Sequence, residues 1–282
     1  MAMITSMDCI AGGDDWKITI PSHALASNSL QIEPKGQENP SELYKMMQKV
    51  AQYWESSGLV NYLVYKSSVD ISWEMVPTEG QQTSLLDRIR SYFQQFIIIA
   101  RVTFGRYLVT DTEKRHLFTK YEALTSFEAQ ETAATTHQVT VDAFCKKQVI
   151  DSQLVWEGKQ IRVLYNYAPI GSEGLHFLVV PIAHKERLTQ LSEEEFVEMQ
   201  TIATTLIRQY PQHLCYRYSK TGSLAGQTVP HFHEHIVFLQ PQDDLWGKLS
   251  VFFRMILPST PLNAVDLAKR VMKLQERFTY GE

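Results

Sequence analysis

Five consecutive residues, His231 to His235, alternate histidine with other side chains in the order His-Phe-His-Glu-His. On a β-strand successive side chains point to opposite faces, so the three imidazoles would share one face and Glu234 would lie on the other. Three imidazoles are costly to bury without polar partners. A neutral imidazole can act as a nucleophile, and His-x-His on a strand can bind zinc. The run therefore indicates nucleophilic catalysis or a metal site, with three surface histidines as the simpler alternative.

Three segments of the chain resemble the signature of the histidine-triad (HIT) family. They are 226–235 (GQTVPHFHEH), 176–181 (HFLVVP) with His184 after it, and 144–147 (FCKK) followed by 154–157 (LVWE). The resemblance covers residues 142–240, with the segments in the order expected for the family. It implies an α+β fold in which a HIT-like antiparallel sheet is packed against helices.

The same resemblance implies a nucleotidyl hydrolase that acts at an α-phosphate and releases a nucleoside monophosphate. His233 would be the nucleophile and would form a nucleotidyl-histidine, while a nearby carbonyl fixes the N–H tautomer of its second nitrogen. His231, His235 and His176 would surround the phosphate and donate hydrogen bonds to its oxygens. Thr228 or a neighbouring histidine could assist the leaving group as a general acid.

Four further residues are implied as substrate contacts. Gln227 and Thr228 resemble the phosphate and leaving-group contacts of the family, and Asn166 falls near its ribose-binding carboxylate. Lys220 stands where many relatives have asparagine, so it could recognise additional phosphate or simply be solvated. Glu234 also departs from the family pattern, which has an apolar residue there, but it is expected to point away from the site.

Composition limits the possible partners. The chain has 282 residues and a formal net charge of −4, without the basic excess of a general nucleic-acid binder. Its three cysteines are odd in number and widely spaced, which favours a reducing cytoplasm over a disulfide framework. No secretory signal and no run long enough to span a membrane is expected. We expect a nucleotide or nucleotidyl ester as the partner, with no cofactor and no metal.

The pattern of elements is that of an α+β meander, which disfavours a doubly wound nucleotide-binding fold. An apolar stripe at steps of three and four predicts a helix over 41–54. The capping-box pair Ser192 and Glu195 predicts another helix that continues to 206. Helical patterns also cover 84–99 and 261–278. The expected strands are 16–21, 59–66, 152–157, 161–167, 176–181, 214–219 and 231–238.

The N-terminal half resembles a decayed copy of the same unit. At one constant offset, 72–76 (SWEMV) aligns with 232–236 (FHEHI), so that Glu74 matches Glu234. The same offset pairs 84–96 with 244–256 and 16–21 with 176–181. Trp73 and Met75 then replace two of the histidines, and Trp16 replaces His176. The predicted domains are a degenerate half at 1–110, a connector at 111–140, a catalytic domain at 141–258 and a packed C-terminal helix at 259–282.

Such a tandem arrangement resembles that of galactose-1-phosphate uridylyltransferase and diadenosine tetraphosphate phosphorylase. It implies a monomer with an internal pseudo-dimer, or a weak homodimer. Those relatives carry glutamine as the third triad residue, whereas this chain keeps His235, which favours the hydrolase branches. The alternatives are a nucleotidyltransferase or phosphorylase of the two-copy type, a non-catalytic nucleotide-binding scaffold, and a metalloprotein.

Overall fold

The computed structural model describes residues 8–36, 38–80, 85–130, 142–241, 245–257 and 259–279. The chain divides into two compact units, residues 1–133 with 220–227 and residues 134–219 with 228–282. Each unit combines an antiparallel sheet with helices, which confirms the predicted α+β class. Among the described residues, no helix has both the length and the apolar character needed to cross a bilayer.

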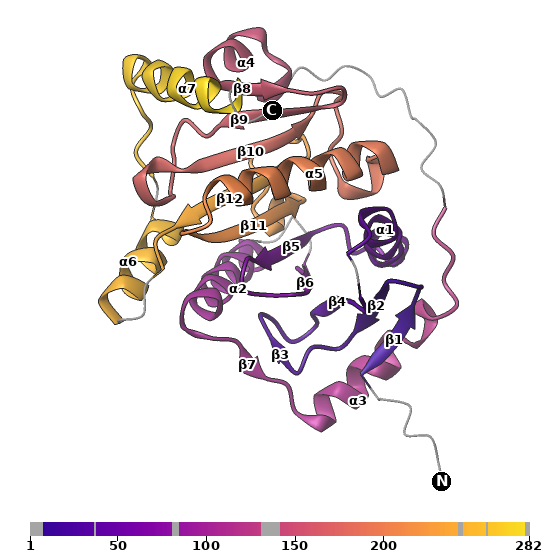
Figure 1. The fold of residues 1–282 in the computed structure, drawn as a ribbon. Coiled ribbons are helices and arrows are strands. Elements are labelled where there is room, and N and C mark those ends of the chain that lie inside the picture. The colour runs from indigo at the N-terminus through magenta and orange to yellow at the C-terminus, as the bar shows by residue number, and fades with distance from the viewer. Residues whose placement is uncertain are drawn as a thin grey trace. The chain divides into compact units, whose positions relative to one another are not determined.

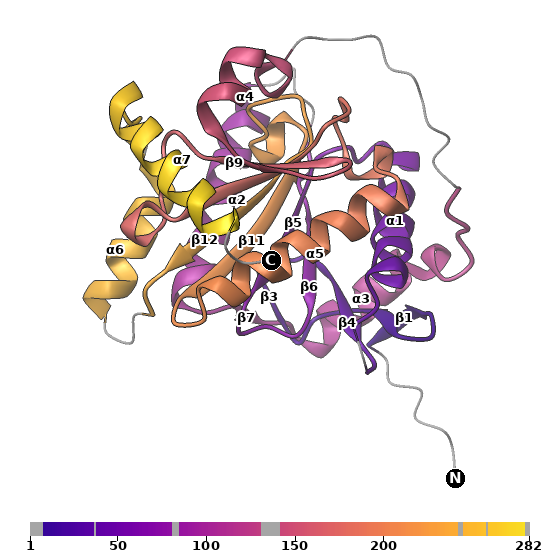
Figure 2. The same ribbon diagram turned by 45° about the horizontal axis from the view of Figure 1, so that its top comes forward.

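The second unit is an antiparallel sheet with the strand order β11-β12-β10-β9-β8. The helix α5 packs against β9 and β10, and α7 packs against α4 and β8 at the opposite edge from β11 (Figures 1 and 2). Its strands are β8 (Leu154–Glu157), β9 (Ile161–Tyr165), β10 (His176–Pro181), β11 (Leu214–Thr221) and β12 (Glu234–Leu239). Its helices are α4 (Lys147–Gln153), α5 (Glu193–Gln209), α6 (Leu245–Ile256) and α7 (Ala264–Thr279).

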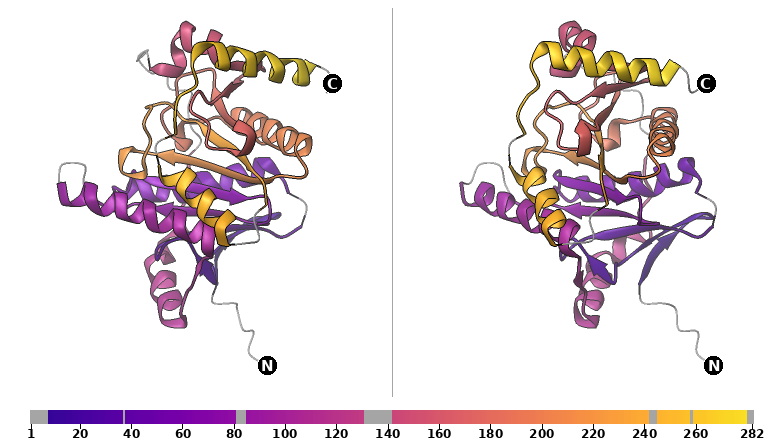
Figure 3. Two further views of the ribbon diagram at one scale, coloured as in Figure 1. Left: turned by 90° about the vertical axis from the view of Figure 1, so that its left-hand side faces the viewer. Right: turned by 60° about the vertical axis from the view of Figure 1, so that its left-hand side comes forward.

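The start of α5 follows the capping signal in the sequence. The Ser192 hydroxyl accepts from the Glu195 N–H at 3.2 Å, and the Glu195 carboxylate accepts from the Ser192 N–H at 2.7 Å. This reciprocal pair satisfies two N–H groups that the first turn of a helix leaves without intrahelical partners. The apolar stripe of α5, including Phe196, Met199 and Leu206, is buried. The predicted helix is confirmed, and Figure 3 shows it lying along one side of the strands.

The first unit contains a sheet with the strand order β1-β2-β4-β6-β5, which α1 covers at β2 and β4. Its strands are β1 (Cys9–Gly12), β2 (Trp16–Thr19), β4 (Leu30–Pro34), β5 (Tyr62–Ser67) and β6 (Trp73–Pro77), and β3 (His23–Ala24) pairs separately with β7 (Tyr107–Leu108). Its helices are α1 (Pro40–Ser56), α2 (Leu85–Phe104) and α3 (Asp111–Lys120). Of the predicted connector 111–140, α3 lies at the start and residues 131–140 are outside the described part.

The two units repeat one topology. Each has three antiparallel strands, a helix, a two-stranded hairpin and a second helix, and the last strand of the hairpin lies beside the third strand. In this order β4 corresponds to β10, α1 to α5, β5 to β11, and β6 to β12. The sequence alignment was therefore correct for the helices and the hairpin. It was wrong for 16–21, because β2 corresponds to β9 and not to β10.

Strand register identifies the residue that stands at the place of His176. Gln31 lies opposite Glu74, as Val179 lies opposite Glu234. Three residues before Gln31 is Asn28, and three residues before Val179 is His176. By this count Asn28, in the turn before β4, takes the position of His176 in the first unit, and Trp16 of β2 does not. The constant offset used in the sequence alignment fails here, because the connections between corresponding strands differ in length in the two units.

The glutamate shared by the two copies is buried in both. The Glu234 carboxylate accepts from Arg217 Nε at 2.7 Å and Nη2 at 3.1 Å, and Arg217 Nη2 also donates to Gln200 of α5 at 2.8 Å. Glu234 therefore faces α5, away from the histidines. Glu74 has other partners, since it accepts from Arg106 Nε at 3.1 Å and from the Leu25 N–H at 2.6 Å.

Replacing Arg217 by methionine is expected to lower the free energy of unfolding by about 3–5 kcal/mol, because it leaves the Glu234 charge buried without its partner. The two side chains are only 7% and 5% exposed. Lys147→Met is a matched control, because Lys147 and Asp151 form an ion pair with side chains 87% and 58% exposed. That change should cost about 0–1 kcal/mol. Urea unfolding measures both, and similar costs would contradict the assignment of a structural role to Glu234.

Candidate active site

His233 lies in an extended segment immediately before β12. The strand predicted at 231–238 begins only at Glu234, because the preceding backbone bonds elsewhere. The Phe232 N–H donates to the carbonyl of Lys185, in the loop after β10, and so 231–233 follows that loop and not the sheet ladder. The His233 side chain is buried, with Phe144 edge-to-face at 5.1 Å and His235 edge-to-face at 4.8 Å between ring centroids.

The tautomer of His233 follows from one hydrogen bond. Its Nδ1 lies 2.7 Å from the carbonyl oxygen of His231. A carbonyl only accepts, so Nδ1 must carry the hydrogen. In the neutral ring, Nε2 then holds the lone pair. The fold thus supplies the carbonyl acceptor that a nucleophilic imidazole requires, and it comes from the histidine two residues earlier.

The same argument assigns the ring hydrogens of His176 and His235. The backbone N–H of Ile170 donates to His176 Nδ1 at 3.3 Å, which makes Nδ1 an acceptor and places the hydrogen on Nε2. His176 Nε2 lies 2.9 Å from His235 Nδ1, so His176 donates and His235 Nδ1 accepts. The remaining hydrogen of a neutral His235 is therefore on its Nε2. Tyr218 stacks on the His235 ring at 4.5 Å with an interplanar angle of 13° and fixes its plane.

Asn166 belongs to this chain of hydrogen bonds. Its Nδ2 lies 3.2 Å from His176 Nδ1 and 3.3 Å from Nε2, and its Oδ1 accepts from the Ala168 N–H at 3.0 Å. Both ends of the amide thus have protein partners. The geometry gives Asn166 a positioning contact with His176, and the ribose contact expected from the sequence stays a prediction.

Burial, with a smaller contribution from His233, lowers the pKa of His176 from the ordinary 6.5 to about 3. The unfolded chain therefore takes up a proton at higher pH than the folded protein does. The stability that His176 contributes is complete above about pH 6.5 and is lost as pH falls toward 3, by about 1.4 kcal/mol per pH unit. We expect His176→Gln to flatten this part of the stability profile in urea unfolding. If the free energy of unfolding fell with pH equally steeply in the variant and the parent protein, the lowered pKa of His176 would be contradicted.

His231 faces away from the other two histidines of the run. Its Nε2 lies 3.0 Å from the carbonyl oxygen of Pro181, and its Nδ1 lies 3.0 Å from Asp142 Oδ2. Burial lowers its pKa, against the opposing effect of Asp142. Both ring nitrogens thus face protein acceptors. The sequence analysis expected His231 to donate to the phosphate, but this arrangement suits it to holding the loop and supplying the carbonyl for His233.

Four side chains, one of them His231, could hold a metal ion. Asp142, Cys145, His184 and His231 each offer one ligand atom, and the four atoms lie within 4.8 Å of one another. A carboxylate oxygen, a thiolate and two imidazole nitrogens are ligands that four-coordinate zinc accepts. If a neutral His231 donates from Nε2 to the Pro181 carbonyl, its Nδ1 carries a lone pair that faces the Asp142 carboxylate. Two acceptors then face each other, and a shared proton or a bound cation would relieve the repulsion. Sequence reasoning missed this set because Asp142 precedes His231 by 89 residues.

The segment that contains Lys220 and Gln227 belongs to the first unit, whereas Thr228, Asn166 and the four histidines belong to the second. Gln227 Oε1 accepts from the Gly222 N–H at 2.7 Å, and Thr228 is exposed. Burial lowers the pKa of Lys220.

Within the first unit, three polar side chains hold this segment. Asn61 Oδ1 accepts from the Leu224 N–H at 3.2 Å, Gln95 Nε2 donates to the Leu224 carbonyl at 2.9 Å, and the Ser91 hydroxyl donates to the same carbonyl. The first unit, which lacks the histidine run, thus positions the loop from which Gln227 comes, and the sequence did not predict this.

Residues 147–241 match the family model described as the HIT domain. These residues form a HIT domain. The match confirms the family expected from the three sequence segments, and it contains Asn166, Lys220, Gln227, Thr228 and the four histidines. It supports nucleotide-related hydrolase or transferase activity in general.

Solved structures that resemble the chain include two that align with most of it. One is a GalT-like protein from Arabidopsis thaliana, with 10% identity and a TM-score of 0.49, covering 94% of this chain and 86% of that one. Another is a uridylyltransferase, with 11% identity and a TM-score of 0.46, covering 88% and 75%. The NitFhit protein of C. elegans is 21% identical with a TM-score of 0.34. It covers 44% of this chain, which spans 27% of that protein.

Proposed function

We propose that this chain is a nucleotidyl hydrolase in which His233 Nε2 attacks the α-phosphorus of a nucleotide substrate. The observation that carries the proposal is the 2.7 Å contact between His233 Nδ1 and the His231 carbonyl. It holds the hydrogen on Nδ1 and leaves the Nε2 lone pair for phosphorus. As the N–P bond forms, the bond from phosphorus to the leaving group breaks, and its electron pair departs with the leaving group.

Water completes the reaction in a second step. It attacks phosphorus, the N–P bond breaks, and its electron pair returns to His233 Nε2. The product is a nucleoside monophosphate, and the proton of the water is released to solvent. In both steps His235 Nε2–H would donate a hydrogen bond to a non-bridging phosphate oxygen, where negative charge develops.

The deduced proton positions also favour one substrate class. Burial lowers the pKa of His176 to about 3, so this ring is neutral near pH 7. With His235 taken as neutral as well, its Nε2–H is too weak an acid to protonate a leaving group. Leaving groups that depart as stable anions are therefore favoured, such as the phosphate end of a dinucleoside polyphosphate or of a nucleotidyl sugar phosphate. Amine or alcohol leaving groups would need a proton that this arrangement does not supply.

Transfer to inorganic phosphate is the second candidate, favoured by the repeated topology of the two units. One experiment separates it from hydrolysis and from binding without reaction. The full chain is incubated with diadenosine tetraphosphate, a nucleotidyl sugar and adenosine phosphoramidate in ¹⁸O-labelled water, with and without inorganic phosphate. We expect a nucleoside monophosphate carrying ¹⁸O, formed equally fast without phosphate. A nucleoside diphosphate formed only with phosphate would favour transfer, and nucleotide binding with no product would favour a scaffold.

A further inference from the structure

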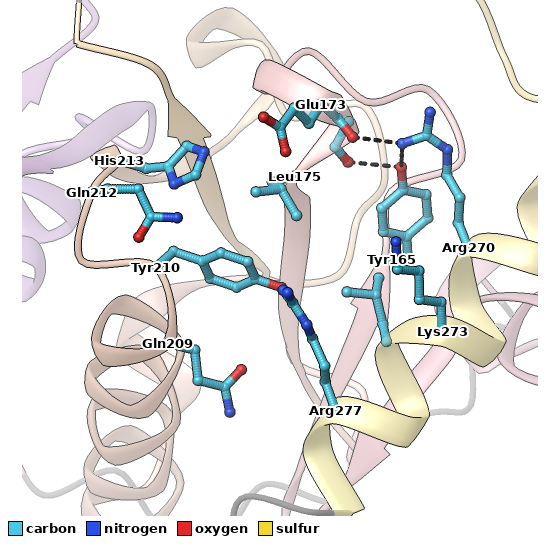
Figure 4. A pocket seen from close by; sticks show the side chains of 12 residues that line it. Tyr165, Glu173, Leu175, Gln209, Tyr210, Gln212, His213, Arg270, Lys273 and Arg277 are labelled. Carbon is cyan, nitrogen blue, oxygen red and sulfur yellow. Dashed lines mark hydrogen bonds between the residues drawn. The ribbon is translucent and has the colours of Figure 1, made fainter.

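The second unit has a pocket on the face of its sheet opposite the histidines. Tyr165 of β9 lies opposite Phe177 of β10, so these two side chains share a face. Phe177 follows His176 directly, and therefore points away from the histidine side. The pocket opens on this second face with a volume of about 390 Å³, between the end of α5, the turn before β11, the turn before β10, and α7 (Figure 4). That volume suits a small metabolite.

Three cations from one face of α7 line this pocket, namely Arg270, Lys273 and Arg277, against the single carboxylate of Glu173. Arg270 is held in place, because its Nη1 donates to the Glu173 carbonyl at 2.7 Å and to the Tyr165 hydroxyl at 3.3 Å. Figure 4 shows Arg277 extending from α7 toward Tyr210. Within the part of the chain that the structure describes, neither Lys273 nor Arg277 forms an ion pair. The pocket therefore presents positive charge that a ligand anion could neutralise.

Polar atoms without partners line the same pocket. The side chain of Tyr210 is only 3% exposed, and its hydroxyl has no hydrogen-bond partner among the described residues. Gln209 Oε1 and His213 Nδ1, from the same end of α5 and the turn that follows it, are also buried atoms without partners there. Buried polar atoms in native proteins are nearly always hydrogen-bonded to protein or to ordered water, so these three atoms call for partners that the described chain does not supply. Gln209 Oε1 can only accept, which calls for a donor such as a hydroxyl group.

The turn before β10 is shaped to fit α7. Gly174 has a φ of +77°, and a Cβ there would lie 2.0 Å from Arg270 Nη1 and 2.8 Å from the Tyr165 hydroxyl. Only glycine lets this turn approach the guanidinium so closely. This wall of the pocket is therefore fixed by specific contacts.

We propose that this pocket binds a phosphate ester of a hydroxyl-bearing small molecule, a sugar phosphate being the simplest case. Its phosphate would lie against Lys273 and Arg277, as cationic side chains bind phosphate oxygens. Its hydroxyl groups would pair with Gln209, Tyr210 and His213. The site is separate from the histidines and does not depend on the function proposed for them.

Isothermal titration calorimetry of the full chain with ribose 5-phosphate tests the proposal. We expect saturable binding that the double change Lys273→Gln and Arg277→Gln weakens by about tenfold or more. Lys269→Gln is the matched control, because Lys269 is an exposed residue of the same helix that does not line the pocket, and it should leave the affinity unchanged. No binding, or equal affinity in the double variant, would overturn the proposal. Loss of binding in His233→Ala instead would also overturn it, since the ligand would then occupy the histidine site.

Two further ligands test the role of the hydroxyl groups. Inorganic phosphate should bind more weakly than ribose 5-phosphate, and ribose alone should give no measurable heat. Tyr210→Phe should weaken the binding of the sugar phosphate more than that of inorganic phosphate, because it removes only the hydroxyl. Equal affinities for phosphate and ribose 5-phosphate, or an unchanged affinity in Tyr210→Phe, would contradict the hydroxyl contacts.

Discussion

His233→Ala is expected to reduce turnover of the nucleotide substrate by about 10⁴–10⁶-fold, the size of loss seen when a catalytic nucleophile is removed. The reason is geometric. Nε2 of His233 is the nitrogen whose lone pair the His231 carbonyl leaves available, through its 2.7 Å contact with Nδ1. Without this ring, the one-step attack of water must replace the two easier steps. Nucleotide binding should persist, because alanine leaves the other contacts in place.

Steady-state kinetics with the substrate from the nucleotide panel measures this loss. His116→Ala is the control, since His116 is an exposed residue of α3 in the first unit and should retain full activity. Because His233 is buried, circular dichroism and the thermal midpoint must show that the variant folds. His233→Gln provides a second test, since glutamine keeps a polar group there but not the nucleophile. Turnover within about tenfold of the parent in either folded variant would contradict the assignment.

His235→Ala is expected to lower turnover by about 10²–10³-fold, the effect of removing one preorganised donor to a developing charge. The chain of hydrogen bonds from Ile170 through His176 places the donor hydrogen on His235 Nε2. A donor to a non-bridging oxygen acts on every substrate alike. The loss should therefore be the same for good and poor leaving groups.

A series of substrates that differ only in the pKa of the leaving group distinguishes this role from proton donation. If His235 protonated the leaving group, the variant would lose most activity on poor leaving groups and little on good ones. Such a dependence would contradict the neutral tautomers deduced for His176 and His235. His176→Phe should give part of the same loss, because His235 would then keep Tyr218 but lose its partner at Nδ1.

Regular periodicity and capping made much of the fold predictable from sequence. The helix after Ser192 is an example, since its capping box and its buried stripe are both local signals. The strand β4 was not predicted, because Leu30-Gln31-Ile32-Glu33-Pro34 has only two alternating apolar residues and ends in proline. Missing β4 also led to the alignment of Trp16 with His176, which the strand register corrects to Asn28.

The site was predictable where residues are close in sequence. His231, His233 and His235 lie in one run, and His176 is placed beside His235 by the pairing of β10 with β12. The donor set with Asp142 and Cys145 was not predictable, because it depends on contacts between distant segments.

Hydrogen-bond partners that only the fold brings together also could not be predicted from the sequence. Asn166 looks like a ligand contact in sequence, and only the geometry shows its amide bonded to His176 and Ala168.

The covalent intermediate is the central claim, and mass spectrometry of the full chain tests it most directly. The protein is mixed briefly with a reactive nucleotide substrate, quenched at alkaline pH, where phosphohistidine-type bonds survive, and digested. We predict a mass increase of one nucleotidyl group on the peptide that contains His233, with fragment ions that place it on that ring, and its absence in His233→Ala. Rapid product formation with no labelled peptide, or a label on another residue, would contradict the account.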